Sequence, residues 1–322
     1  MTALAAAGLL AAALPLLLNA YTVSLATNAI ILALLAMSTQ LLTGVAGLPS
    51  MGQTAYLGVG AYTAVLLAQV GVTSGPAQLA AAVAAGAAAA AVTAPLALRT
   101  RGPVFLMVTF TIGQLAVTAA NKWRTVTGGD EGVSVAPVTL PGLPPLTLDG
   151  YLYWYALTVF VIAAVGVWWL LRSRLGLLLR GCAAHEPRMA ALGHPVTAEF
   201  TAGYVIAGAL AGAGGALLSA AHRYVSPADF GFDMATVALL AAALGAGRMW
   251  GAVLGAIAVV ATRDLAGAAI TGGHGIALLG ALLLIVAYAR PARQTAVRLR
   301  RRTPAAPAGP AVTPPASPEA EA

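Results

Sequence analysis

The sequence contains very little charge. Only 8% of its 322 residues are Asp, Glu, Lys or Arg, whereas 60% are hydrophobic and the mean hydropathy is +0.86. Soluble domains carry about 25% charged residues, and so few polar side chains would not cover a surface exposed to water. The composition therefore excludes a soluble globular protein. It predicts an all-α, polytopic transmembrane helical bundle, because helices satisfy their own backbone hydrogen bonds in lipid.

Cysteine and lysine are almost absent as well. The single cysteine, Cys182, excludes an internal disulfide. The single lysine, Lys122, lacks the glycines and the Ser or Thr of Gly-x-x-x-x-Gly-Lys-Ser/Thr, which excludes a standard P-loop in this chain. The four histidines have no metal-ligand spacing, and no Ser-His-Asp or paired-carboxylate pattern is present. We therefore predict no catalytic residue, no metal site and no cofactor bound by this chain.

Ten apolar runs, separated by proline, glycine or charge, are candidate membrane spans. They cover residues 3–18, 22–42, 54–70, 77–98, 103–122, 151–171, 197–221, 233–247, 251–270 and 275–290. A span needs about 20 residues, so the short first, eighth and tenth runs make the expected number eight to ten. The first run lacks a basic start, which argues against a cleaved signal peptide and leaves that reading as the alternative. We expect residues 1–302 to form the transmembrane domain and residues 303–322 a disordered cytoplasmic tail.

Arginine is concentrated in alternate connections between these runs. Arginines occur at 99 and 101, in the stretch 172–188, at 248, and from 290 to 302. Short cytoplasmic loops are enriched in Lys and Arg, and alternation through ten spans brings all four groups to one face. That face is predicted to be cytoplasmic, with both termini inside.

A charged island, "RSRLGLLLRGCAAHEPRMAALGHP" at 172–195, interrupts the apolar sequence. Apolar residues form two groups within it: Leu175 with 177–179, and 189–192. Pro187 and Gly193 delimit a predicted amphipathic helix of about two turns. Two interpretations follow from the residues, a docking element for another protein or an interfacial helix that rests on anionic lipid.

Six blocks of sequence carry a resemblance to a known family. They are "GVAGLPSMGQTAYLGVGAYTAVLL" (44–67), "RGPVFLMVTFTIGQ" (101–114), "WRTVTGGDEGVS" (123–134), "RSRLGLLLRGCAAHEPRMAALG" (172–193), "VSPADF" (225–230) and "GRMWGAVLGA" (247–256). In this order they resemble the branched-chain amino acid ABC transporter permeases of the LivM type, from about residue 30 to residue 302. Within them, "EPRMAALG" (186–193) is similar to the Glu-Ala-Ala loop of ABC importer permeases.

The resemblance implies the permease subunit of an ATP-binding-cassette importer for branched-chain or related amino acids. Such a subunit lies in the plasma (inner) membrane of a bacterium and is not itself an enzyme. Its implied partners are a second homologous permease, two ATPase subunits that bind ATP and Mg, a solute-binding protein and the lipid bilayer, with no nucleic acid. The loop 172–196 becomes the ATPase-coupling loop, with coupling residues Glu186, Arg188, Met189, Ala190, Ala191 and Gly193. Glu186 either contacts the ATPase or caps its own helix.

Two further groups of residues are candidate sites. Thr127, Gly128, Gly129 and Asp130 form an outer gate or a binding-protein contact, or else a turn that needs positive φ at its glycines. Gly52, Gly58 and Gly60 interrupt an early helix and line a translocation path, or else allow close helix packing.

The predicted spans hold few ionisable residues, and these lie near span ends. The nearest exceptions are Glu199, Asp233 and the Arg263–Asp264 pair. Ion-coupled carriers keep such groups at membrane depth, so energy for transport is expected to come from partner subunits. A secondary carrier or channel that works alone remains the alternative.

The arginine pattern makes a direct prediction about topology. Single cysteines introduced near residues 100, 185, 248 and 300 should react with a membrane-impermeant maleimide only from the cytoplasm, and those near residues 135 and 226 only from outside. Labelling of position 185 from the outside of intact cells would contradict the whole orientation.

Overall fold

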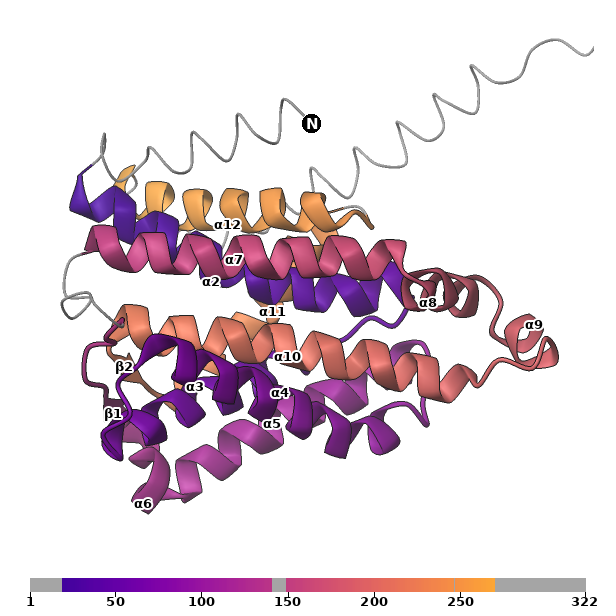
Figure 1. Cartoon of the computed structure of the whole chain (residues 1–322), viewed down its shortest axis with the longest axis horizontal. Coiled ribbons are helices and arrows are strands. Elements are labelled where there is room, and N and C mark those ends of the chain that lie inside the picture. The colour runs from indigo at the N-terminus through magenta and orange to yellow at the C-terminus, as the bar shows by residue number, and fades with distance from the viewer. Residues whose placement is uncertain (1–18, 141–148, 246, 270–322) are drawn as a thin grey trace, which may run out of the picture.

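The computed structural model describes residues 19–140, 149–245 and 247–269, and it is a bundle of long helices (Figure 1). The longer helices are α2 Ala20–Gln40, α3 Gln53–Gln69, α4 Gly75–Ala97, α5 Pro103–Lys122, α7 Asp149–Arg172, α10 Val196–His222, α11 Phe232–Leu244 and α12 Met249–Ala269. The shorter elements are η1 Leu41–Val45, α6 Arg124–Thr127, η2 Gly129–Glu131, β1 Val133–Ser134, α8 Arg174–Ala184, α9 Glu186–Ala191, β2 Tyr224–Val225 and η3 Pro227–Phe230.

Eight of the ten predicted runs are helices, with boundaries that differ by a few residues. The runs 3–18 and 275–290 and the tail 303–322 lie outside the described residues. Six segments are long and apolar enough to cross a membrane: Ala20–Val45, Gly75–Ala97, Pro103–Lys122, Gly150–Arg172, Val196–His222 and Pro227–Leu244. The helical bundle is therefore found, whereas the count of ten spans and the side of the termini stay predictions.

The run 233–247 is shorter than predicted, because α11 ends at Leu244. The chain then turns through Gly247, whose φ is +78°. The buried side-chain amide of Gln40 stabilises this turn: it donates to the Ala242 carbonyl at 2.9 Å and accepts the N–H groups of Gly247 and Arg248 at 3.3 and 3.2 Å. Gln40 on α2, which is distant in sequence, thus fixes the end of α11. Sequence periodicity does not reveal such a contact.

Helix α10 lies at the centre and packs against α2, α3 and α4. In Figure 1, α2, α7 and α12 lie on one side of it, and α3, α4 and α5 on the other. Glycine allows the close contacts: a Cβ at Gly212 would lie 2.4 Å from the Ala82 carbonyl oxygen, and one at Gly215 would lie 2.0 Å from that of Leu57. Small residues let helix backbones approach in lipid, where the hydrophobic effect does not drive helices together.

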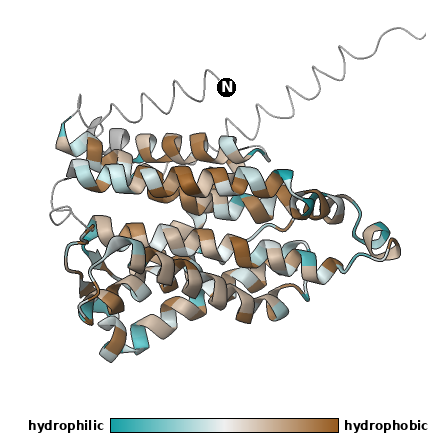
Figure 2. Ribbon diagram, viewed as in Figure 1, coloured by the Kyte–Doolittle hydropathy of each residue, from teal (hydrophilic) through white to brown (hydrophobic). Residues whose placement is uncertain are grey.

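The two ends of the bundle differ in character. At one end, Arg101 in the α4–α5 connection pairs with Glu186 of α9, and Arg172, Arg180 and Arg248 line one cavity. At the opposite end, β1 and β2 form a two-stranded antiparallel sheet, with Val133 opposite Val225 (Figure 1). Figure 2 shows hydrophobic residues along the helices and hydrophilic residues gathered toward these ends. The described arginine connections therefore lie together, as the alternation rule predicts, and residues 290–302 lie outside the described chain.

The glycine contacts of α10 predict a contrast between two equivalent substitutions. Gly212→Ala should destabilise the protein by about 1–3 kcal/mol, because its Cβ would collide with backbone. Gly166→Ala on α7, where nothing lies within 4 Å of the added carbon, should be neutral or stabilising by up to about 1 kcal/mol through helix propensity. Thermal unfolding of both variants in detergent measures this difference, and equal melting temperatures would show that the contact does not limit packing.

Candidate functional site

The charged island folds as two short helices at the arginine end of the bundle. Helix α8 turns sharply after α7, and a Cβ at Gly176 would lie 2.5 Å from the Leu170 carbonyl oxygen. The buried residues of α8 are Gly176, Leu179 and Cys182, which recur every third residue and so share one face. Leu179 packs toward Gly203 of α10. Helix α8 is therefore an amphipathic helix anchored on α7 and α10.

A second short helix, α9, follows after one extended residue. His185 separates the two helices with φ −153° and ψ 84°. The short helix predicted between Pro187 and Gly193 is therefore found as α9, and α8 before it is a second helix that was not predicted. The physical reason for the break is Pro187, which lacks an N–H and would clash with the preceding turn if α8 continued, whereas the first turn of a new helix accepts proline.

Helix α9 presents most of its surface to the outside, and none of its residues is buried. Arg188, Ala190 and Ala191 are exposed, whereas Met189 packs against Gly181 of α8. Leu192, just after the helix, is 69% exposed. Gly193 ends the segment with φ +85°, a conformation that favours glycine. Five of the six predicted coupling residues thus lie on one projecting segment, and the sixth, Glu186, is at its start.

Glu186 forms an ion pair within the chain. Arg101 Nη2 donates to Glu186 Oε1 at 2.9 Å, and Arg101 Nε donates to Oε2 at 3.0 Å. The arginine also lies over the Phe200 ring, 5.0 Å from its centroid, and donates to the Thr100 carbonyl at 3.1 Å. Glu186 was predicted either to contact the ATPase or to cap its own helix. The observed contact is neither of these, because its partner Arg101 belongs to the same chain and lies 85 residues away in sequence. The pair joins α9 to the connection between α4 and α5.

The native cysteine, Cys182, lies on the buried face of α8. Cys182 is 2% exposed. Its burial, followed by the carboxylates of Glu199 and Glu186, raises the pKa of its thiol above the ordinary value. Reactive cysteines are exposed and have a lowered pKa, so this thiol is a poor nucleophile at neutral pH and should interfere little with labelling of introduced cysteines.

At the opposite end, Thr127, Gly128, Gly129 and Asp130 form a compact turn. Gly128 and Gly129 have φ of +72° and +64°, which confirms that the turn needs positive φ. The buried Thr127 hydroxyl donates to the Trp123 carbonyl at 2.8 Å and accepts the Gly129 N–H at 3.3 Å. Asp130 is exposed. The turn is internally hydrogen-bonded, and its role as a gate or a binding-protein contact stays a prediction.

Gly52, Gly58 and Gly60 are all buried. Contrary to expectation, Gly58 and Gly60 lie within an uninterrupted α3, and the break is earlier, between η1 and Gly52. Added Cβ atoms would lie 2.8 Å from the Thr109 carbonyl oxygen, 2.7 Å from the Phe230 ring and 2.4 Å from the Gly212 carbonyl oxygen, respectively. Their observed use is close packing, and a translocation path beside them stays a prediction.

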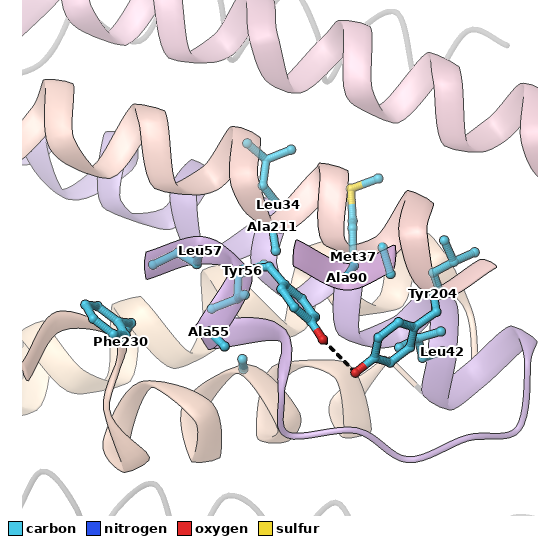
Figure 3. Packing of buried hydrophobic residues seen from close by; sticks show 14 of the residues in the cluster. Leu34, Met37, Leu42, Ala55, Tyr56, Leu57, Ala90, Tyr204, Ala211 and Phe230 are labelled. Atoms are coloured by element: carbon cyan, nitrogen blue, oxygen red, sulfur yellow. Dashed lines mark hydrogen bonds between the residues drawn. The ribbon is translucent and has the colours of Figure 1, made fainter. Parts of the chain in front are cut away.

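A polar network that sequence patterns did not reveal lies beside these glycines. Tyr56 of α3 donates to the Tyr204 hydroxyl of α10 at 2.7 Å, and their rings meet edge to face (Figure 3). The Ser38 hydroxyl of α2 lies 2.8 Å from Gln53 Oε1 and 2.7 Å from the Ala207 carbonyl oxygen. Among the side chains whose burial the structure describes, which leave out Asp149 and Asp264, no Asp, Glu, Lys, Arg or His is buried. The buried polar groups among them are hydroxyls and amides.

Long apolar helices, small-residue packing and charge confined to the ends define a multi-pass helical membrane protein. The chain belongs to the family described as branched-chain amino acid transport system / permease component, which matches residues 21–287. Members of this family are transport subunits and not enzymes.

Two curated relatives are similar over most of the chain. Both are high-affinity branched-chain amino acid transport system permease proteins LivM, one from Escherichia coli K12 and one from Salmonella typhimurium LT2. The identities are 28% over 308 residues and 27% over 307 residues, and each alignment covers 88% of this chain and 72% of the relative. No solved structure matches the chain.

The Arg101–Glu186 pair makes a local prediction. The two side chains are 33% and 39% exposed, so the pair should be worth about 0.2–1 kcal/mol. Arg101→Gln and Glu186→Gln should each raise the rate of tryptic cleavage after the exposed Arg188 by up to about fivefold, through local opening. The double variant should show no further increase, and Arg99→Gln is the matched control.

Additive effects of the two substitutions would show that the side chains act independently. An equal increase in the Arg99→Gln variant would show a general charge effect at this end.

Proposed function

We propose that this chain is the membrane-spanning subunit of an ATP-driven importer for branched-chain or related amino acids. It pairs with a second homologous permease and with two ATPase subunits that bind ATP and Mg. A solute-binding protein delivers the substrate, which moves to the cytoplasm across the inner membrane of a bacterium. The family match and the LivM relatives support the substrate class.

The α8–α9 segment carries the proposal. It projects from the arginine end, exposes Ala190, Ala191 and Leu192, and is anchored through Leu179 and through the Arg101–Glu186 pair. A small apolar surface on a fixed support suits a groove on a partner, because little order is lost when it docks. We therefore assign α9 as the coupling helix, with Arg188 and Met189 flanking the contact.

The source of energy follows from the same features. The sequence has no P-loop, and the side chains whose burial the structure describes, Asp149 and Asp264 not among them, include no buried Asp, Glu, Lys, Arg or His that would carry a coupled proton. ATP hydrolysis by partner subunits is consistent with both observations.

The opposite end is proposed to receive the binding protein at the turn 127–130, whose Asp130 is exposed. The path for substrate is proposed to lie beside α3. Gly58 and Gly60 present backbone there rather than side chains, and the hydroxyls of Tyr56 and Tyr204 lie close by along the same two helices.

Substitutions in α9 test the coupling role. Ala190→Arg changes an exposed side chain, and Gly193→Trp places a bulky residue at φ +85°, so both should disturb α9 without unfolding the bundle. We expect normal membrane insertion, together with a loss of at least about tenfold in binding-protein-stimulated ATP hydrolysis, equivalent to about 1.4 kcal/mol of docking energy. Glu186→Ala should have a milder effect, because the pair it breaks is half-exposed.

Ala136→Arg, at an exposed position at the opposite end, is the matched control and should leave ATPase assembly intact. The measurement is stimulated ATP hydrolysis and subunit stoichiometry of the purified complex. Full stimulation and normal assembly in both α9 variants would remove α9 from the coupling interface.

A further inference from the structure

A cavity of about 700 Å³ lies at the arginine end, beside the island but distinct from α9. Its walls come from α2 and η1, from the last turns of α7, from α8 and from the start of α12, and Figure 1 shows α2, α7, α8 and α12 adjacent at this end. Arg172, Arg180 and Arg248 line it from three different segments, and none of its lining residues is acidic. The described walls therefore carry an unbalanced positive charge.

The cavity also has an apolar part. Met37, Ala164, Val167 and Val253 line it from α2, α7 and α12. Trp168 and Trp250 complete the wall and are 45% and 46% exposed. Tryptophan is enriched where a membrane protein meets the headgroup region, so charge and apolar surface meet here at the expected depth of a lipid headgroup.

The surrounding structure positions the Arg172 side chain and the backbone of Arg248. The Arg172 guanidinium stacks on Trp168, with Cζ 4.0 Å from the ring centroid. The Gln40 amide accepts the backbone N–H of Arg248 at 3.2 Å. A Cβ at Gly44 would lie 2.0 Å from the end of the Gln40 side-chain amide, so only glycine leaves room for this contact.

We propose that this cavity binds one anionic phospholipid from the leaflet at the arginine end. Guanidinium groups bind phosphate oxygens through paired hydrogen bonds, and basic pockets between membrane helices accept anionic headgroups. The three arginines hold the phosphate, and the surface formed by Met37, Val167 and Val253 holds the upper part of an acyl chain. A phospholipid is favoured over free phosphate because the apolar wall is continuous with the charged one.

Quenching of tryptophan fluorescence tests the site in the purified full-length chain in a neutral detergent. Phosphatidylglycerol with brominated acyl chains should quench at lower concentration than brominated phosphatidylcholine. Arg172→Gln, Arg180→Gln and Arg248→Gln should each weaken this preference by about fivefold, and the triple variant should lose it. Arg174→Gln, an exposed arginine of α8 outside the cavity, is the matched control and should retain it. Arg172→Lys should lose part of the preference while keeping the charge.

Three results would overturn the proposal. Quenching of the triple variant like that of the wild type would place the lipid elsewhere. Weakening by Arg174→Gln as large as that of the cavity variants would indicate general surface charge. Competition by millimolar inorganic phosphate that abolishes the preference would assign the cavity to a free anion. If the triple variant aggregates, the single variants and Arg172→Lys decide the question.

Discussion

The close approach of α10 to α3 and α4 is the constraint on which the rest of the structure depends. Where Gly208, Gly212 and Gly215 face α3 and α4, an added methyl group would lie 2.0 to 2.4 Å from the nearest atom. Lipid does not drive helices together, so contact area between small residues must provide the stabilisation. The small residues of the sequence thus allow close helix packing at these three positions.

Helix α10 also connects the two ends of the molecule. Its 27 residues begin at Val196, separated by four residues from the end of α9 at Ala191, and end at His222, just before β2 begins at Tyr224. Because α10 packs on three helices, a displacement of α9 would be transmitted through the bundle rather than absorbed in a loop. The buried hydroxyl pair of Tyr56 and Tyr204 lies along this route and joins α10 to α3. This arrangement gives the proposed coupling segment a rigid path to the opposite end.

The sequence allowed much of the fold to be predicted, because long apolar runs and their breaks depend on local composition. Eight helices and the grouping of the described arginine connections follow from these patterns. The missed features depend on contacts between distant segments. Gln40 stabilises the turn after α11, Arg101 pairs with Glu186, and the Tyr56 hydroxyl donates to that of Tyr204.

The division of the island into two helices can be predicted from its sequence. Pro187 permits a helix to start near it and prevents one from passing through it, so a stop after Ala184 follows from proline chemistry. The sequence pattern correctly placed the exposed residues of α9 on one segment. It did not reveal which residues support that segment. Burial of Leu179 and Cys182 against α10 depends on the tertiary fold, and no periodicity in the island specifies the partner helix.

The central claim is that transport through this chain is powered by a partner ATPase and not by an ion gradient. Uptake of a radiolabelled branched-chain amino acid into proteoliposomes that contain this chain with its permease, ATPase and binding-protein partners tests it most directly. The account predicts uptake that requires enclosed ATP and the binding protein, and that persists after proton and sodium gradients are collapsed. Uptake by this chain alone, driven by an imposed ion gradient in the absence of ATP, would contradict it.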